Sequence, residues 1–478
     1  MNQKSTYLFT LLFVLVFFNA FSQVGIGTTE PHASSILDVT STEQGLLAPR
    51  MTSAQRLTIA TPAEGLLVFD TDENVFYFFD GTTWLPLESA EKRDNYKLIK
   101  SAADLADELA AGGGTVYLLD PDTLYEINGT ITLAVPININ DAYIFGEDTN
   151  GDVLVSTGTI FEGVKGGSIK GITLISTGGS VFNLNGTGDG SLIFRDSAIV
   201  NSNSVGTVSD FKLVFLSIVR YSNNLNGITY TDIEELLLNS AGWDGLNKGT
   251  YETLTGIFNI ITKQGGFSTV EETATAAFDV TGITSITGSA GMRNVSFSGD
   301  GNYVNGSSPY IGYNFTNDWD VNCPGLKVET DNNATGDINL DYSVGSGATT
   351  AFSGTGMSSR TKLSGNTTSE NLFRFRSSPG INNRIIYDGM QTRFFNVSAS
   401  VSFQGDNNNA VFVFYILKNG SILEETKVYR EVGENNDVGA LAIIGTIELS
   451  TNDYIEVWVE RYSGAGNLLA VSMNLSIR

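Results

Sequence analysis

The acidic side chains beside the short apolar runs of residues 190–240 are the groups whose types could support chemistry. A glycoside hydrolase needs two carboxyls at a set separation, one of them with a raised pKa. The carboxyls of this stretch belong to Asp196, Asp210, Asp232, Glu234 and Glu235. Nothing in their spacing pairs them, and most are better interpreted as solvated turn residues. The sequence therefore predicts no catalytic residue.

One histidine and one cysteine, His32 and Cys323, limit the chemistry further. A Ser-His-Asp triad, a Cys-His pair or a multi-histidine metal site cannot be assembled from one such chain. A lone cysteine also rules out an internal disulfide framework. Cys323 is predicted to be a small buried apolar residue, and the alternative is a bridge between chains.

Three oxygen-bearing residues repeat the first spacing of a calcium loop. Asp148, Asn150 and Asp152 stand at positions one, three and five. Val153 takes the place of the turn glycine, and no later glutamate completes the set. Calcium is therefore the one cofactor that the sequence suggests, and a metal-free Asp-Gly turn is the favoured alternative.

Two tryptophans are candidates for exposed contact with a carbohydrate. Trp243 follows Gly242, and Trp319 lies between two aspartates. Each is equally consistent with local packing, because an indole ring buries a large apolar area.

The composition favours many short strands over long helices. The 478 residues include 52 Gly and only 9 Pro, and the formal net charge is −25. Such an acidic surface repels nucleic acid and anionic membranes, so neither is an expected partner. We expect an all-β protein with several domains.

Residues 1–22 have the three parts of a secretory signal peptide. Lys4 supplies positive charge, residues 7–18 form an apolar run, and Ala20-Phe21-Ser22 precedes the cleavage site. The run is shorter than the ~20 residues that span a bilayer. The mature chain is predicted to begin at Gln23, to be secreted without membrane insertion, and to associate with a cell surface.

Residues 23–89 form the first predicted domain, a small β module. Two apolar runs flank the acidic turn 70–74 and predict a β-hairpin, and Asp80-Gly81 marks the next turn. The motif Val24-Gly25-Ile26-Gly27-Thr28 and the segments after it resemble a head module of secreted surface and tail-fibre-like proteins of Bacteroidetes bacteria. That resemblance implies a surface or fibre context and no particular reaction.

Residues 97–348 form the second predicted domain. An apolar stripe of helical spacing runs over 102–110, Ser101 and Asp104 form a capping box, and Gly112 to Gly114 end the only convincing helix. Short strands that end in Ser or Thr then recur at intervals of about 20–23 positions, which is typical of one coil of a parallel β-solenoid. These strands are Ile172–Ser176, Leu192–Ser197, Leu213–Ser217, Leu236–Ser240 and Phe258–Thr262. A β-sandwich with evenly spaced strands is the alternative.

The helix, its glycine stop and the brief strands that follow resemble the entry to the right-handed parallel β-helix of the pectate-lyase-like superfamily. Its hydrolases usually carry Asn-Thr-Asp, Asp-Asp, His-Gly and Arg-Ile-Lys motifs, and none occurs in this sequence. Its lyases need calcium-binding acids and a basic residue, for which only Arg195 beside Asp196 and Arg220 are local candidates. The resemblance leaves enzymatic activity open, and the missing motifs favour a protein that is not an enzyme.

Residues 351–478 form the third predicted domain, an antiparallel sandwich. Residues 395–403 alternate strictly, 410–417 are apolar on both faces, and Asn419-Gly420 marks a hairpin. This pattern, with a last alternating strand over 469–477, resembles the jelly roll of the tumour-necrosis-factor and complement-C1q type. The resemblance implies a homotrimer, in which one face of strand 411–417 would meet a neighbouring subunit. A monomeric sandwich is the alternative.

Two triplets, Asp122-Thr123-Leu124 and Asp196-Ser197-Ala198, resemble the sites where Bacteroidetes attach O-glycans, at Thr123 and Ser197.

Taken together, the patterns predict a secreted, non-enzymatic, fibre-like surface protein, trimeric through its C-terminal domain, that binds a cell-surface glycan or a protein receptor. The alternative is a polysaccharide lyase or glycoside hydrolase acting on the face of the β-helix.

Overall fold

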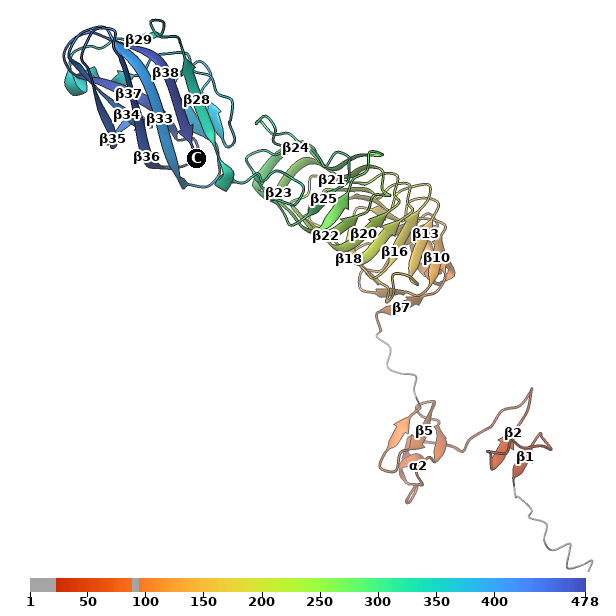
Figure 1. Ribbon diagram of the computed structural model, residues 1–478. Helices are drawn as coiled ribbons and strands as arrows, with labels where there is room; N and C mark the ends of the chain where they lie inside the picture. The colour runs from red at the N-terminus through yellow and green to blue at the C-terminus, as the bar shows by residue number, and fades with distance from the viewer. Residues whose placement is uncertain (1–22, 88–93) are drawn as a thin grey trace, which may run out of the picture. The chain divides into compact units, whose positions relative to one another are not determined.

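The computed structural model describes residues 23–87 and 94–478, and the chain divides into two compact units at Asp94 (Figure 1). The predicted signal peptide lies outside the described residues. Nearly all regular structure is β, as expected. Among the described residues, none of the helices is long and apolar enough to cross a membrane.

The first unit contains two small sheets. One pairs β1 (Val24–Ile26) in parallel with β2 (Leu37–Val39). The other has the order β3-β4-β5-β6, in which the predicted hairpin is confirmed, and its strands are β3 (Arg50–Met51), β4 (Leu67–Asp70), β5 (Val75–Phe79) and β6 (Trp84–Pro86).

A short helix of the first unit was not expected from the sequence. Helix α2 (Ser53–Leu57) begins at Thr52, whose side chain accepts from the N–H of Gln55, and the Gln55 side chain in turn accepts from the N–H of Thr52. So short a segment does not display a helical period. The interpretation of 102–110 as the only helix was therefore wrong.

The first part of the second unit is a parallel β-solenoid, which confirms the main prediction of fold class. Its 21 strands form one sheet that coils so that strands stack on three faces (Figure 1). The first face contains β7 (Tyr96–Ile99), β9 (Leu124–Ile127), β12 (Tyr143–Phe145), β15 (Gly167–Lys170) and β27 (Trp319–Asn322). The second contains β10 (Thr130–Leu133), β13 (Val153–Ser156), β16 (Thr173–Ser176) and β25 (Ser296–Ser298).

The third face contains β8 (Tyr117–Leu118), β11 (Ile137–Asn138), β14 (Phe161–Gly163), β17 (Phe182–Asn185), β19 (Gly206–Ser209), β21 (Ile228–Thr231) and β26 (Val304–Asn305). Longer strands turn corners and serve more than one face. These are β18 (Ser191–Val200), β20 (Leu213–Ser222), β22 (Glu235–Trp243), β23 (Gly249–Thr269) and β24 (Ala274–Arg293).

The register confirms the predicted stacking of coils and corrects its details. Leu192, Val214 and Leu236 are direct neighbours, so two successive coils are equal in length. The strand Thr173–Ser176 pairs with Ala198 and Ile199, however, whereas residues 192–195 pair with 167–170. The predicted alignment of 172–176 with 192–197 was wrong. The chain turns a corner at Asp196, so residues 192–195 lie on the first face and residues 173–176 lie on the second.

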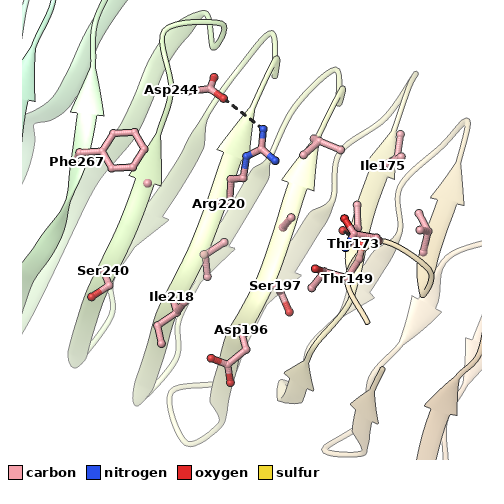
Figure 2. A pocket seen from close by; sticks show the side chains of 16 residues that line it. Thr149, Thr173, Ile175, Asp196, Ser197, Ile218, Arg220, Ser240, Asp244 and Phe267 are labelled. Atoms are coloured by element: carbon pink, nitrogen blue, oxygen red, sulfur yellow. Dashed lines mark hydrogen bonds and ion pairs between the residues drawn. The ribbon is translucent and has the colours of Figure 1, made fainter. Parts of the chain in front are cut away.

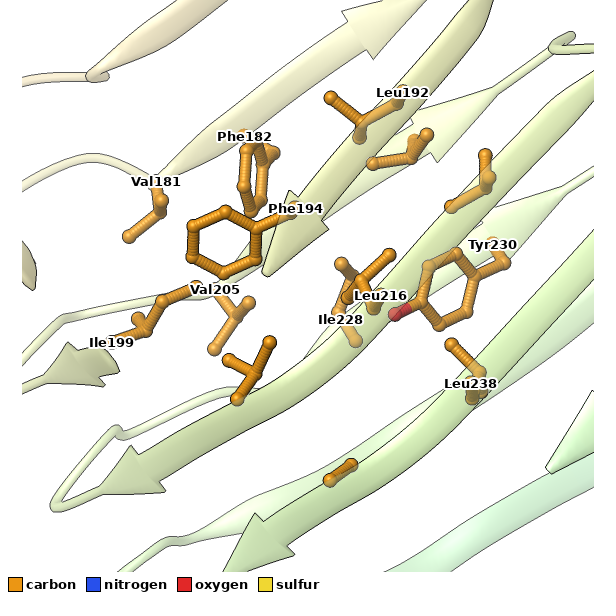
Figure 3. Packing of buried hydrophobic residues seen from close by; sticks show 14 of the residues in the cluster. Val181, Phe182, Leu192, Phe194, Ile199, Val205, Leu216, Ile228, Tyr230 and Leu238 are labelled. Carbon is orange, nitrogen blue, oxygen red and sulfur yellow. The ribbon is translucent and has the colours of Figure 1, made fainter. Parts of the chain in front are cut away.

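Like apolar side chains stack inside the coil. Phe161 and Phe182 are buried neighbours in successive coils, with ring centroids 5.7 Å apart. Phe182 also contacts Phe194 edge to face, at 5.5 Å between centroids (Figure 3). Burial of such apolar side chains holds each coil to the next. Cys323 is also buried and unpaired, as the sequence predicted.

A short helical segment caps the start of the solenoid, as expected. It begins as a 3-10 turn, η1 (Ala102–Leu105), and continues as α3 (Ala106–Ala111). The Asp104 carboxylate accepts from the N–H groups of Lys100 and Ser101. Buried Glu108 accepts from Lys97 at 2.6 Å and from Tyr125 at 3.0 Å, which ties the cap to the first coils.

The second unit continues into an antiparallel sandwich of two sheets with a shared apolar core. One sheet contains β28 (Gly336–Asp341), β38 (Leu468–Ile477), β33 (Arg393–Gly405), β36 (Val438–Leu449) and β29 (Ala348–Thr350). The other contains β31 (Phe375–Ser377), β32 (Ile385–Tyr387), β37 (Tyr454–Ser463), β34 (Ala410–Lys418), β35 (Ser421–Val432) and β30 (Thr361–Lys362). The 3-10 turns are η2 (Asp331–Asn333) and η3 (Gly356–Ser359).

The domain boundary lies earlier than predicted. Strands β28 and β29 pair with β38, so the sandwich begins before the expected limit at 348–351. The solenoid ends with β27 at Asn322. The sequence did not mark this boundary because the partner strand of β28 is the last strand of the chain. The jelly-roll topology stays a prediction.

Strand β34 is buried on both faces within one chain. Val413 and Tyr415 are buried, and the Arg360 guanidinium lies 4.8 Å from the centroid of the Tyr415 ring. Arg360 also pairs with Glu460 at 2.8 Å. The expectation that a neighbouring subunit covers one face of this strand was therefore wrong, because the chain covers it itself.

Candidate ligand groove on the second face

A groove of about 780 Å³ lies on the outside of the second face, across strands β13, β16, β18, β20, β22 and β23 (Figure 2). Successive residues of a strand point to opposite sides. Because Ile199, Tyr221 and Trp243 point into the core, the residues before them point out into the groove.

One row of outward-pointing residues, one from each successive coil, forms the floor of the groove. In register along the solenoid it reads Thr173, Ala198, Arg220, Gly242 and Phe267. Small side chains on both sides of Arg220 leave its guanidinium accessible.

Gly242 allows the aromatic ring of the next coil to lie close. A Cβ atom at this position would come within 2.9 Å of the Phe267 ring. Phe267 is nevertheless 45 % exposed and lines the groove. Arg220 pairs with Asp244 at 4.0 Å, and both are drawn beside Phe267 in Figure 2.

A column of corner residues forms one edge of the groove. Asp196, Ile218 and Ser240 occupy equivalent positions in three coils, with φ of 51°, 55° and 55°. A β-branched residue with positive φ is strained, at a cost of about 1–3 kcal/mol. Ile218 is also 60 % exposed, so burial does not offset this strain. Strained residues cluster at functional sites, so Ile218 is a candidate ligand contact.

The groove therefore combines an ion pair, an exposed aromatic ring and an exposed aliphatic side chain. The carboxyl of Asp196 lies on the corner edge of the groove and that of Asp244 on the opposite edge (Figure 2). This arrangement is suited to recognition, since aromatic and aliphatic surfaces stack on apolar faces of a ligand and the charged groups hydrogen-bond its polar groups.

The two predicted carbohydrate contacts do not lie in the groove. Trp243 is fully buried and stacks between Tyr221 and Tyr251, with centroids 3.9 and 5.0 Å away. Trp319 is buried against Phe315. The expectation of exposed rings was wrong because both side chains point into the coil.

The two predicted glycosylation sites differ in exposure. Ser197 is buried, and its hydroxyl donates to the carbonyl of Arg195 at 2.7 Å. The folded chain buries this hydroxyl, and modification of Ser197 stays a prediction. Thr123 lies in a turn and is partly exposed, so its modification stays a prediction.

The predicted calcium ligands form a hydrogen-bonded turn. The buried Asp152 carboxylate accepts from the N–H groups of Gly129, Glu147 and Asp148. Burial opposes its charge, but these three bonds lower its pKa below the usual range. Asp148 accepts from Asn150 in the same turn. In the described part of the chain, no group of three His, Cys, Asp or Glu side chains is arranged to hold a metal ion. Calcium binding stays a prediction.

The remaining candidates lie apart from the groove. Arg195 is on the first face, where it donates to the Tyr143 hydroxyl at 3.4 Å and lowers the pKa of that tyrosine. Asp210 and Asp232 occupy corners with positive φ, and Asp232 accepts from the N–H of Ile257. Their interpretation as turn residues is confirmed. Glu234 is exposed and Glu235 partly so.

Sequence reasoning missed Ile218, Gly242, Asp244 and Phe267. One signal could have found part of the set. Ala198, Arg220 and Gly242 are evenly spaced at one coil length, so an alignment of coils places them in one row.

Comparison with known proteins gives one family match. Residues 25–102 match the model of a phage tail like trimerisation region. No curated protein matches the chain.

Solved structures similar to this chain include three with low TM-scores. Murine APRIL is 12% identical over 30% of this chain and 98% of its own, with a TM-score of 0.19. The enzymatically active domain of tailspike protein 4 of bacteriophage CBA120 is 10% identical over 90% of this chain and 77% of its own, with a TM-score of 0.22. That of tailspike protein 2 of the same phage is 10% identical over 89% and 86%, with a TM-score of 0.16. The fold of this chain rests on its own strand pairing.

Proposed function

We propose that this chain is a secreted, non-enzymatic, fibre-like protein that assembles as a homotrimer and binds a cell-surface glycan through the groove on the second face. The observation that carries the glycan proposal is one groove lined by the strained and exposed Ile218, the exposed Phe267 two strands away and the Arg220–Asp244 pair. The homotrimer is supported by the match of residues 25–102 to a trimerisation region.

Trimer and groove act together in this proposal. A shallow, open groove makes few contacts, so each site binds weakly. Three linked sites on one particle raise avidity by about 10²–10⁴ without new contacts, provided that all can reach the surface together.

Glycan arrays probed with the secreted protein test the binding. Replacing Arg220 by alanine removes a cation from the groove, and we expect loss of array signal. Arg293→Ala is the matched control, since Arg293 is an exposed arginine on the first face that pairs with Asp320 at 2.9 Å. Equal loss in both variants, or no glycan bound by the wild type, contradicts the proposal.

Secretion and trimer formation have separate tests. N-terminal sequencing of the exported protein is expected to start at Gln23, and a start at Met1 contradicts the signal peptide. Sedimentation of that protein is expected to give three times the mass of one chain, and a monomer at micromolar concentration contradicts the homotrimer.

Cleavage of a polysaccharide is the second candidate, because Asp196 and Asp244 both line the groove. Incubation with acidic and neutral glycans, with and without calcium, followed by mass spectrometry of released fragments, separates the two functions. Fragments that disappear in Asp196→Asn favour the enzyme, and their absence for all glycans favours adhesion.

A further inference from the structure

The first unit exposes an apolar face on three strands, β4, β5 and β6, of its four-stranded sheet. Cross-strand pairs place Leu67 beside Phe78, Phe78 beside Leu85, and Phe69 beside Phe76. These five residues alternate with Val68 and Tyr77, which are buried on the opposite face, so all five lie on one side. Phe76 is 40 % and Leu85 41 % exposed, and the other three are partly exposed. We call this surface the aromatic face.

The opposite side of the same sheet is already covered. Arg56 of α2 lies 3.6 Å from the centroid of the Tyr77 ring and donates to Asp70 at 2.9 Å. A sheet normally buries one apolar face to form its core. Here that requirement is met on the helix side, and the aromatic face remains as a second apolar layer in contact with water.

The two-stranded sheet of the first unit also leaves apolar side chains in contact with water. Register places Val24 opposite Leu37 and Ile26 opposite Val39, so all four side chains share one side, and they are 40–56 % exposed. A two-stranded sheet alone is marginally stable in water. Parallel strands are normally buried on both faces. Both sheets of this unit therefore present apolar surface that a single chain leaves open.

We infer that the aromatic face is the surface through which three copies of this chain pack against one another. The inference rests on the proposed homotrimer and assigns its contact residues. Residues 25–102, which include the whole aromatic face, match a trimerisation region. None of its five side chains is charged, and Arg50 of β3 lies on the same side of the sheet beside Phe69, with the guanidinium 5.4 Å from the Phe69 ring centroid. A face that carries no carboxylate meets identical copies without adding to the repulsion expected of a chain of net charge −25, which suits a self-association surface.

Cysteine cross-linking tests this contact directly, because the sole native cysteine, Cys323, is buried. We expect Phe76→Cys and Leu85→Cys of the secreted protein to form disulfide-linked dimers under mild oxidation. Leu57→Cys is the matched control, since Leu57 is 68 % exposed but belongs to α2 on the other side of the sheet. We expect at least ~10-fold less cross-linking there, because thiols held apart cannot bridge.

Charge substitution gives an independent measurement. Leu85→Glu places a carboxylate in the contact and is expected to weaken association by about 100-fold, whereas Leu57→Glu leaves it unchanged. A wild type that sediments as a monomer overturns the proposed homotrimer. A trimeric wild type whose Phe76→Cys and Leu85→Cys variants cross-link no better than Leu57→Cys overturns the aromatic-face assignment alone. Native-like circular dichroism of each variant separates lost contact from lost fold.

Discussion

The Nζ atom of Lys263 lies 2.6 Å from Oε2 of Glu252 in the interior of the solenoid, where both side chains are 2 % exposed. The residues stacked on Lys263 are Leu238 and Met292, so the ion pair interrupts an apolar ladder. The second carboxylate oxygen of Glu252 accepts from Nε1 of Trp243 at 3.1 Å. Both charges of this group are therefore paired within one coil.

Breaking this ion pair is expected to destabilise the solenoid strongly. Lys263→Met leaves the Glu252 carboxylate buried without its cation, which costs about 3–5 kcal/mol of unfolding free energy. The double variant Lys263→Met with Glu252→Leu is expected to recover much of that loss, because no buried charge remains. Urea unfolding followed by circular dichroism measures both. A loss below about 1 kcal/mol in the single variant contradicts the buried pair.

The stacked indole of Trp243 is expected to serve stability and not ligand binding. Trp243→Ala removes a buried ring and costs about 3–5 kcal/mol. Trp243→Phe keeps an aromatic ring between Tyr221 and Tyr251, and we expect its glycan-array profile to match that of the wild type. A folded Trp243→Phe protein that loses glycan binding contradicts the burial of this residue.

The coil could be predicted from the sequence because its main signals are local. The regular spacing of apolar strands and the glycine stop after Ala111 each depend on a short window of the chain. The direction of single side chains could not be predicted. A corner residue such as Ser240 shifts the alternation, so Trp243 turns inward while Gly242 turns outward.

The burial of charged side chains and the pairing of strands far apart in the chain could not be predicted from the sequence, for a different reason. Lys263 and Glu252 are charged residues on one long strand, and the alternation rule assigns charged side chains to solvent. Only their mutual contact makes burial tolerable, and that contact forms when the strand turns a corner. The start of the sandwich depends on the pairing of Gly336 with Ile477, and a local pattern carries no sign of that pairing.

Relief of backbone strain at Ile218 is expected to increase stability and to reduce binding. Asparagine adopts positive φ more readily than a β-branched residue, so Ile218→Asn is expected to stabilise the solenoid by about 0.5–1 kcal/mol. The same change removes an exposed aliphatic contact from the groove and is expected to lower the glycan signal. Ser240→Asn, at the equivalent corner of the next coil, is the control, because serine is not β-branched and its replacement is expected to raise the free energy of unfolding less. If Ile218→Asn destabilises the protein, the strain argument is wrong.

The ion pair of Asp70 with Arg56 is expected to make the first unit sensitive to acid. Burial opposes the charge of Asp70, but hydrogen bonds from Arg56, Ser53 and the N–H groups of Asp72 and Glu73 prevail and lower its pKa from 3.8 to about 2. A carboxyl with a lower pKa in the folded state stabilises that state at pH above about 4. This contribution is lost as the pH falls toward 2.

Pepsin digestion between pH 4 and 2 measures this effect, since the protease cleaves unfolded chain and its products identify the site by mass spectrometry. Cleavage within residues 64–87 is expected to rise steeply as the pH falls in the wild type. Asp70→Asn has no carboxyl to protonate, so its cleavage is expected to be higher at pH 4 and to change less with pH. Parallel curves for the two proteins would show that another carboxyl governs the acid response of this unit.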